Sequence, residues 1–151
     1  MVKLEAGPLS LRSSRTFAAP RERVFRAFVE ADQLKRWFIE PSEGRFTEEP
    51  QIDARPGGLY RFVGESAGKA WRIHGTYREV APPGRLVFTW EWEDYPEKGD
   101  DGRTLVTVEL MERGDQTELV LTHEGFLNDP SREDHRKGWE GCFDGVAKVL
   151  R

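Results

Sequence analysis

The sequence has few of the residues from which metal and thiol sites are built. Its 151 residues contain one cysteine, Cys142, and three histidines, His74, His123 and His135. The histidines are far apart in the sequence, and none has a partner at a metal-ligand spacing such as HExxH or CxxC. Glycine-rich phosphate motifs are absent as well. We therefore expect no metal site and no bound cofactor.

Long apolar runs and an excess of positive charge are also missing. No apolar segment approaches the roughly 20 residues of a membrane span, and residues 1–20 are too polar for a signal peptide. Charged residues make up 33% of the chain and the net charge is -4, which argues against a nucleic-acid partner. We expect a cytoplasmic protein with no membrane span. Its length suits one domain, residues 1–151, with a real core.

The most regular pattern in the chain is an amphipathic helix at residues 131–151. Its apolar side carries His135, Trp139, Cys142, Phe143, Val146, Val149 and Leu150. Asp129 is the expected N-cap, and Cys142 is expected to be a small buried hydrophobe. Three interior glycines cost about 1 kcal/mol each relative to alanine, so packing must stabilise this helix.

The residues before this helix predict a sheet. Alternating apolar residues predict strands at 9–18, 45–52, 59–64, 70–80, 85–92, 106–110 and 117–123. Two short helices are predicted at 21–30 and 33–38, the second capped by Asp32. Short links favour antiparallel pairing, and helices segregated from strands indicate an α+β fold. We predict a curved antiparallel sheet of about six or seven strands wrapped around the long C-terminal helix.

Two local patterns refine this prediction. In the strand at 70–80, Trp71 and Tyr77 favour one face whereas Val80 favours the other, and a β-bulge near Tyr77 would reconcile them. The segment 53–58 is rich in glycine and proline, which predicts a tight turn. Asp53 and Arg55 are expected to form a surface ion pair there.

Five sequence strings resemble a known family. In order, they are VFRAFVEADQLKRWF, DARPGG, GTYREVAPPGRLVFTW, LTHEGF and GWEGCFDGVAKVL. They resemble the family of activator of Hsp90 ATPase homologue 1-like proteins, which belongs to the START-like (SRPBCC, Bet v 1-like) superfamily. The resemblance extends from about Phe17 onward. It implies a helix-grip fold, in which the sheet grips the C-terminal helix around a deep pocket. Members of this superfamily range from lipid carriers and hormone receptors to aromatases and cyclases.

The aromatic content fits such a pocket, because apolar ligand sites are lined by rings with a few polar groups. The alternative is that the same rings simply fill the core. His123 has the inward parity of Leu119 and Leu121, which makes it a candidate polar contact. The alternative for His123 is a hydrogen bond to a neighbouring strand or to the last helix.

These observations favour a binding protein that encloses a small hydrophobic or amphipathic molecule between the last helix and the sheet. The predicted ligand-binding residues are Trp37, Phe38, Tyr60, Ile73, Phe88, Trp90, Leu121, His123, Phe126, Trp139 and Phe143. One alternative is a cyclase-, aromatase- or hydrolase-like enzyme that uses His123 or Tyr60 as acid or base. Another is a protein-interaction or chaperone-associated (Hsp90 activator-like) module. A homodimer is compatible with the sequence. We do not expect an Hsp90-type chaperone partner, because the eukaryotic cochaperone carries a separate N-terminal domain for chaperone contact.

Overall fold

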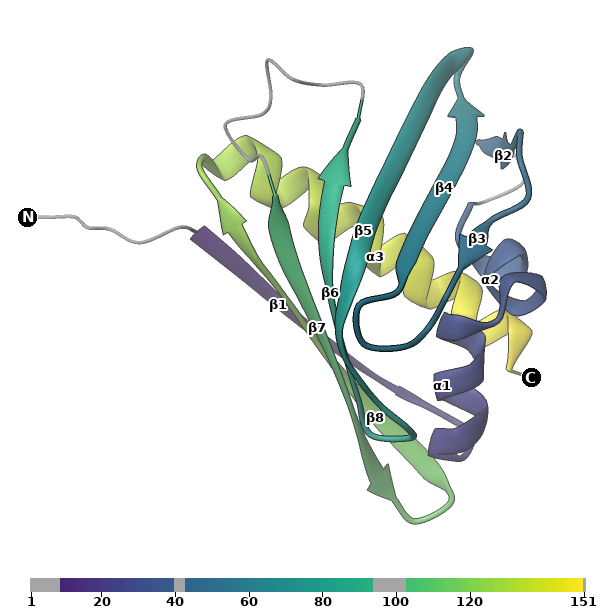
Figure 1. Ribbon diagram of the computed structural model, residues 1–151. Helices are drawn as coiled ribbons and strands as arrows, with labels where there is room; N and C mark the ends of the chain where they lie inside the picture. Colours follow the sequence, from purple (N-terminus) through teal and green to yellow (C-terminus); the bar gives the residue numbers. More distant parts are fainter. Residues whose placement is uncertain (1–8, 40–42, 94–102, 151) are drawn as a thin grey trace, which may run out of the picture.

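Antiparallel pairing joins eight strands into one curved sheet (Figure 1). This computed structural model describes residues 9–39, 43–93 and 103–150. The strands are β1 Leu9–Phe17, β2 Gly44–Phe46, β3 Gln51–Ile52, β4 Leu59–Ser66, β5 Lys69–Ala81, β6 Arg85–Trp92, β7 Thr104–Arg113 and β8 Gln116–Phe126. Their order in the sheet is β1-β8-β7-β6-β5-β4-β2, and β3 pairs with β4. The predicted antiparallel α+β architecture is confirmed.

The predicted single strand at 45–52 is wrong. This segment forms two short strands, β2 and β3, with a break between them. At the break the N–H groups of Thr47 and Glu48 both donate to the carbonyl of Val63, which interrupts the regular ladder. Pro50 follows, and it has no N–H to donate.

The predicted bulge in β5 is confirmed. The register between β5 and β6 shifts between Tyr77 and Glu79. Before the shift, Trp71 and Tyr77 are both buried; after it, Glu79 is exposed. One extra residue therefore changes which face of the strand points inward.

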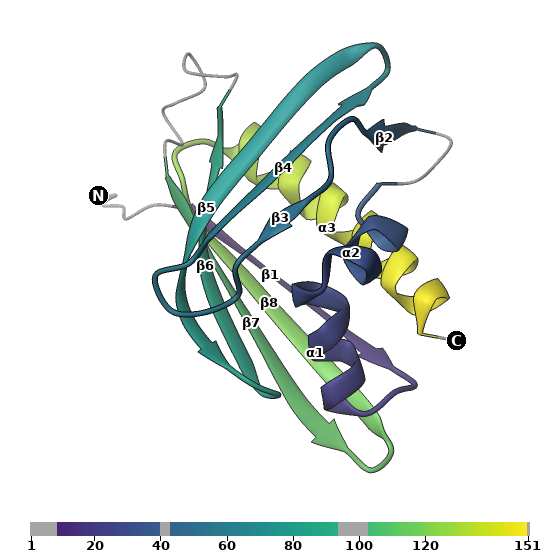
Figure 2. The same ribbon diagram turned by 45° about the vertical axis from the view of Figure 1, so that its right-hand side comes forward.

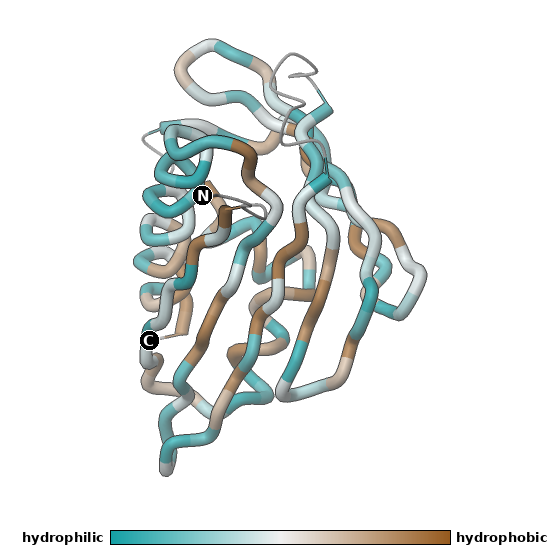
Figure 3. Tube along the Cα trace, turned by 90° about the vertical axis from the view of Figure 1, so that its left-hand side faces the viewer, coloured by the Kyte–Doolittle hydropathy of each residue, from teal (hydrophilic) through white to brown (hydrophobic). Residues whose placement is uncertain are grey.

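Side-chain alternation explains how the sheet obtains an inner face. Figure 3 shows hydrophobic and hydrophilic residues alternating along the strands. In β7, for example, Val106, Val108 and Leu110 are buried while the residues between them are partly exposed. The buried face is covered by the helices, so the core lies between the two layers.

Three helices cover this inner face: α1 Arg21–Val29, α2 Ala31–Trp37 and α3 Asp129–Val149. Figures 1 and 2 show α3 crossing the sheet, with α1 and α2 beside its C-terminal half. The α2 helix packs directly on α3 at Gly145. A Cβ atom at Gly145 would lie 2.6 Å from the carbonyl oxygen of Trp37, so this crossing requires glycine. None of the helices in the described ranges is long and apolar enough to cross a membrane.

Both predicted helix caps are corrected by the structure. The N-cap of α3 is Asn128, whose side chain accepts a hydrogen bond from the backbone N–H of Ser131 at 2.9 Å. Asp129 is instead the first helical residue, where its negative charge interacts favourably with the positive end of the helix dipole. The N-cap of α2 is Glu30, which makes no side-chain capping bond, and Asp32 lies in the first turn.

Candidate functional site

A small cavity lies between the helices and the inner face of the sheet. Residues from α1, α2, β4, β5, β6 and α3 form its wall, together with the residue that follows α2. They are Phe28, Leu34, Trp37, Phe38, Tyr60, Phe62, Tyr77, Leu86, Phe88, Trp90 and Trp139. The free volume is about 20 Å³, which is room for one water molecule.

The wall of this cavity is almost entirely aromatic. Among the described lining residues, only Leu34 and Leu86 lack a ring. The rings meet at tilted or edge-on angles; those of Trp90 and Trp139, for example, are 5.2 Å apart between centroids. Such pairs pack closely and add to the stability obtained from burial alone. In this conformation the rings therefore occupy most of the space between helix and sheet.

Phe38 is the point at which the wall comes nearest to solvent. Of the lining residues within the described ranges, it alone is not buried. The centroid of its ring lies 5.2 Å from that of Phe62 and 6.3 Å from that of Trp90, and both of these residues belong to the sheet. Because Phe38 follows the last residue of α2, a small movement of that helix would move this ring.

Most polar groups in the wall are already hydrogen-bonded within the protein. The indole Nε1 of Trp37 donates to the carbonyl of Ala27 at 2.7 Å. The hydroxyl of Tyr60 donates to the carbonyl of Thr89 at 2.5 Å. Trp90 differs, because its buried Nε1 finds no acceptor among the described residues.

His123 is completely buried beside the cavity, and its contacts define its tautomer. Trp139 donates its indole N–H to Nδ1 of His123 at 3.1 Å. The hydroxyl of Thr104 donates to the carbonyl of Trp90 at 3.0 Å, so its oxygen is left to accept from Nε2 of His123 at 2.7 Å. Both ring nitrogens are therefore occupied, and the hydrogen is on Nε2. One bond reaches a neighbouring strand and the other reaches the last helix, as expected if His123 is hydrogen-bonded within the protein.

Burial shifts the pKa values of His123 and Tyr60, the two groups considered as acid or base, and also that of Cys142. The pKa of His123 is lowered well below 6.5, mainly by burial and to a smaller extent by the nearby His135. Burial also raises the pKa of Tyr60 well above 10 and that of the Cys142 thiol to about 12. All three are neutral near pH 7, and none is poised to exchange a proton there.

A second indole–histidine pair lies next to the first. Trp92 donates its N–H to Nε2 of His135 at 2.9 Å. Nδ1 of His135 lies 2.8 Å from the carbonyl of Ser131, which can only accept, so Nδ1 carries the hydrogen. The rings of His135 and His123 are 5.1 Å apart, and these contacts tie the first half of α3 to the sheet.

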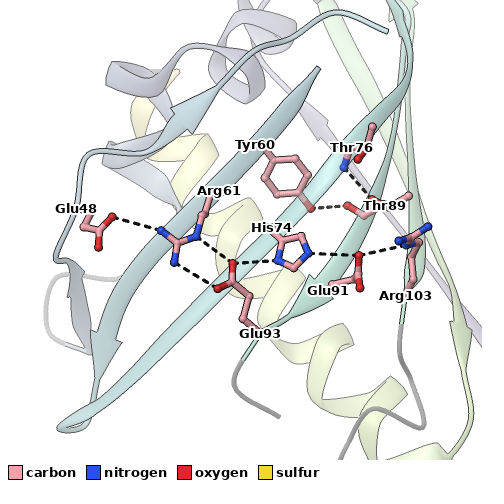
Figure 4. Close-up of polar contacts among 9 residues, drawn as sticks. All are labelled: Glu48, Tyr60, Arg61, His74, Thr76, Thr89, Glu91, Glu93 and Arg103. Carbon is pink, nitrogen blue, oxygen red and sulfur yellow. Dashed lines mark hydrogen bonds and ion pairs between the residues drawn. The ribbon is translucent and has the colours of Figure 1, made fainter. Parts of the chain in front are cut away.

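The opposite face of β4, β5 and β6 carries a chain of polar and charged side chains (Figure 4). In order, it contains Glu48, Arg61, Glu93, His74, Glu91 and Arg103. Arg61 lies 3.0 Å from the carboxylate of Glu93, and this hydrogen bond is the main cause that lowers the pKa of Glu93. Nδ1 of His74 also lies 2.9 Å from that carboxylate. Ion pairs that are this exposed contribute little, about 0 to 1 kcal/mol each.

Six of the predicted site residues line the cavity: Trp37, Phe38, Tyr60, Phe88, Trp90 and Trp139. The other five, Ile73, Leu121, His123, Phe126 and Phe143, are buried in the core outside its wall. The wall also contains residues that were not predicted: Phe28, Leu34, Phe62, Tyr77 and Leu86. Strand parity with Tyr60 and Phe88 was the available signal for Phe62 and Leu86. The role of all these residues in ligand binding stays a prediction.

The described residues contain no group of three or more His, Cys, Asp or Glu side chains that could hold a metal ion. The predicted ion pair between Asp53 and Arg55 is present at 2.9 Å. The sequence also predicts an exposed loop at 94–103, because this segment is polar and rich in proline and glycine. It lies outside the described residues except for Arg103.

An antiparallel sheet that wraps around a long C-terminal helix, with two short helices after the first strand, defines a helix-grip protein of the START-like class. Residues 18–151 match the model of one family in that class, described as "Activator of Hsp90 ATPase homolog 1-like protein". The chain belongs to this family.

Among curated proteins, the chain is similar to the human "Activator of 90 kDa heat shock protein ATPase homolog 1". The two are 21% identical over 150 residues, which cover 99% of this chain and 38% of the human protein. The chain thus spans less than half the length of that relative.

Solved structures of bacterial proteins share the fold over nearly the whole chain. Protein CV1439 from Chromobacterium violaceum has a TM-score of 0.81 and 26% identity, covering 93% of this chain and 96% of that one. Mll3558 from Rhizobium loti has a TM-score of 0.79 and 26% identity, covering 95% and 97%. CalU16 from Micromonospora echinospora has a TM-score of 0.71 and 26% identity, covering 95% and 76%.

Proposed function

We propose that this protein binds one small apolar molecule in the aromatic cavity between α2, α3 and the sheet. The observation that carries the proposal is a wall made almost entirely of aromatic side chains, with a single partly exposed ring, Phe38, at its edge. Apolar surfaces of this kind hold small molecules through burial and ring contacts. Membership of a START-like family supports the same site.

Binding requires the cavity to expand, because about 20 Å³ is far smaller than an organic molecule. The α2 helix is the element best suited to move. It has only seven residues and no side-chain cap, and a helix this short depends on its neighbours for stability. Displacement of α2 would carry Trp37 and Phe38 away from the strands and open the wall. The free energy needed for opening lowers the apparent affinity.

The hydrogen bonds beside the cavity favour binding over acid–base catalysis. A general base must reach the proton that it removes. Both nitrogens of His123 are occupied by protein partners, and the hydroxyl of Tyr60 donates to a backbone carbonyl. These groups shape and stabilise the wall, which is a role that a carrier or sensor requires.

Native mass spectrometry of the purified protein tests this proposal. We expect a 1:1 complex with an apolar compound that is released on denaturation, and the same spectrum reports any homodimer. If no compound is retained, a panel of uncharged aromatic probes should contain members that raise the melting temperature in a saturable way. An empty protein that no probe stabilises would contradict the proposal.

A second candidate function is contact with an Hsp90-type chaperone. It is supported by the family and by the similarity to the human ATPase activator. The measurement is the chaperone's ATPase rate with and without this chain. A saturable change in rate would support the contact, and an unchanged rate at high concentration of the chain would contradict it.

A further inference from the structure

The five tryptophans differ in how they use their indole N–H groups. Four donate to protein acceptors over distances of 2.7 to 3.1 Å: Trp37 to Ala27, Trp71 to Ser66, Trp92 to His135, and Trp139 to His123. The fifth, Trp90, has no acceptor among the described residues. Only 5% of Trp90 is exposed, so bulk water does not satisfy this donor either.

An unsatisfied donor at this position is costly. A buried polar group without a partner destabilises a protein by about 1 to 3 kcal/mol. Trp90 also lies at the centre of the ring cluster, 5.2 Å from Trp139 and 5.7 Å from His123 between ring centroids. A phenylalanine would supply an aromatic ring here without the unpaired N–H. The N–H of Trp90 therefore needs an acceptor that the described part of the chain does not supply.

A trapped water is the simplest alternative partner, since the cavity has room for one. A buried water typically makes about three hydrogen bonds. Few donors remain for it in this wall, because the N–H groups of Trp37 and Trp139 and the O–H of Tyr60 already donate elsewhere. An acceptor atom on an otherwise apolar ligand needs only one bond and fits this wall better.

We infer that the molecule bound in this cavity is neutral and carries a hydrogen-bond acceptor, such as a carbonyl or ether oxygen, that receives the N–H of Trp90. The remainder of the molecule is apolar and contacts the surrounding rings. The ligand is uncharged because the lining residues that the structure describes include no charged side chain, and an unpaired buried ion is strongly disfavoured. This inference rests on the proposed function and adds the ligand's class to it.

Two probes of nearly equal shape separate the acceptor from the hydrocarbon. Acetophenone carries a carbonyl, and α-methylstyrene carries a C=CH2 group in the same place. Both are titrated into the full chain while the five indole N–H signals are followed by NMR, with the Trp90 signal assigned from the spectrum of Trp90→Phe. We expect both probes to shift the Trp139 signal and only acetophenone to move the Trp90 proton strongly downfield.

An isosteric replacement tests the same bond by affinity. Replacement of Trp90 by benzothienylalanine exchanges the N–H for sulfur and keeps the ring. We expect the affinity for acetophenone to fall roughly three- to tenfold, as for loss of one net hydrogen bond, and that for α-methylstyrene to stay unchanged.

Each other outcome overturns the inference in a recognisable way. Equal binding of both probes, with no selective shift of the Trp90 signal, would leave the proposed function in place and refute the acceptor. A long-lived water that contacts the Trp90 N–H and persists in the acetophenone complex would assign the donor to that water. Failure of every probe to bind would remove the proposed function together with the inference.

Discussion

Two hydrogen bonds decide what the buried His123 can do. His123 accepts the N–H of Trp139 and donates to Thr104, so it acts as a connector between α3 and β7. Removal of one partner would leave the other buried and unpaired, and such losses cost about 1 to 3 kcal/mol. In this environment the imidazole positions the ring of Trp139 in the wall.

The neutral state of His123 predicts a pH dependence of stability. The unfolded chain takes up a proton near pH 6.5, whereas the folded chain does not, because its His123 pKa is well below that value. The free energy of unfolding should therefore fall as the pH drops below about 6.5, by up to about 1.4 kcal/mol per pH unit. Urea denaturation at pH 7.5, 6.5 and 5.5 measures this slope.

His123→Gln is the matched control for this slope. A glutamine amide can accept from Trp139 and donate to Thr104, but it does not titrate. The slope between pH 6.5 and 5.5 should be smaller in the variant than in the wild type. Equal slopes in the two proteins would show that His123 does not titrate as described.

At the scale of elements, the three glycines of α3 have different roles. Beyond the adjoining backbone of α3, a Cβ at Gly138 or Gly141 meets no described atom within 4 Å, whereas a Cβ at Gly145 would meet the backbone of Trp37 at 2.6 Å. Gly138→Ala and Gly141→Ala should each stabilise the protein by up to about 1 kcal/mol through helix propensity. Gly145→Ala should destabilise it by about 1 to 3 kcal/mol, because α2 must move away. Urea denaturation of the three variants tests this ranking, and a Gly145→Ala protein as stable as the other two would contradict it.

Phe38, the C-cap residue of α2, is expected to limit access to the cavity. Phe38→Ala should lower the free energy of unfolding by roughly 2 to 4 kcal/mol, since the side chain is largely packed against other rings. It should also increase the association rate of an apolar probe by removing the ring at the edge of the wall. Stopped-flow fluorescence measures this rate.

Leu59→Ala is the control for Phe38→Ala. Leu59 is 66% exposed and does not line the cavity. Its loss should leave the association rate unchanged. If Phe38→Ala also leaves that rate unchanged, probes reach the cavity by another route.

Sequence patterns predicted the elements better than their ends. Alternation along the strands placed the sheet and the bulge near Tyr77 correctly. The same patterns missed the break between β2 and β3. They also predicted Asp129 as the N-cap in place of Asn128, because Asn and Asp are equally good caps. The sequence could not distinguish Gly145 from the other two glycines of α3. The close approach of α2 that requires glycine there is a tertiary contact.

At the scale of the whole molecule, the family fold could be predicted but the size of the cavity could not. Parity indicates which rings point inward, and six of the predicted residues do line the cavity. Whether inward rings fill a space or surround it depends on their angles and on the position of α2. The free volume of about 20 Å³ shows that in this conformation they nearly fill it.

The proposed function requires this ring-filled interior to open and hold an apolar molecule. The most direct measurement is an NMR titration of the wild-type chain with α-methylstyrene, following the indole N–H signals of all five tryptophans. We predict saturable shifts of the signals from Trp37, Trp90 and Trp139, which line the cavity, with a 1:1 stoichiometry confirmed by native mass spectrometry. Signals that do not move up to the solubility limit of the probe, or that drift without saturation, would show that the interior is only a packed core.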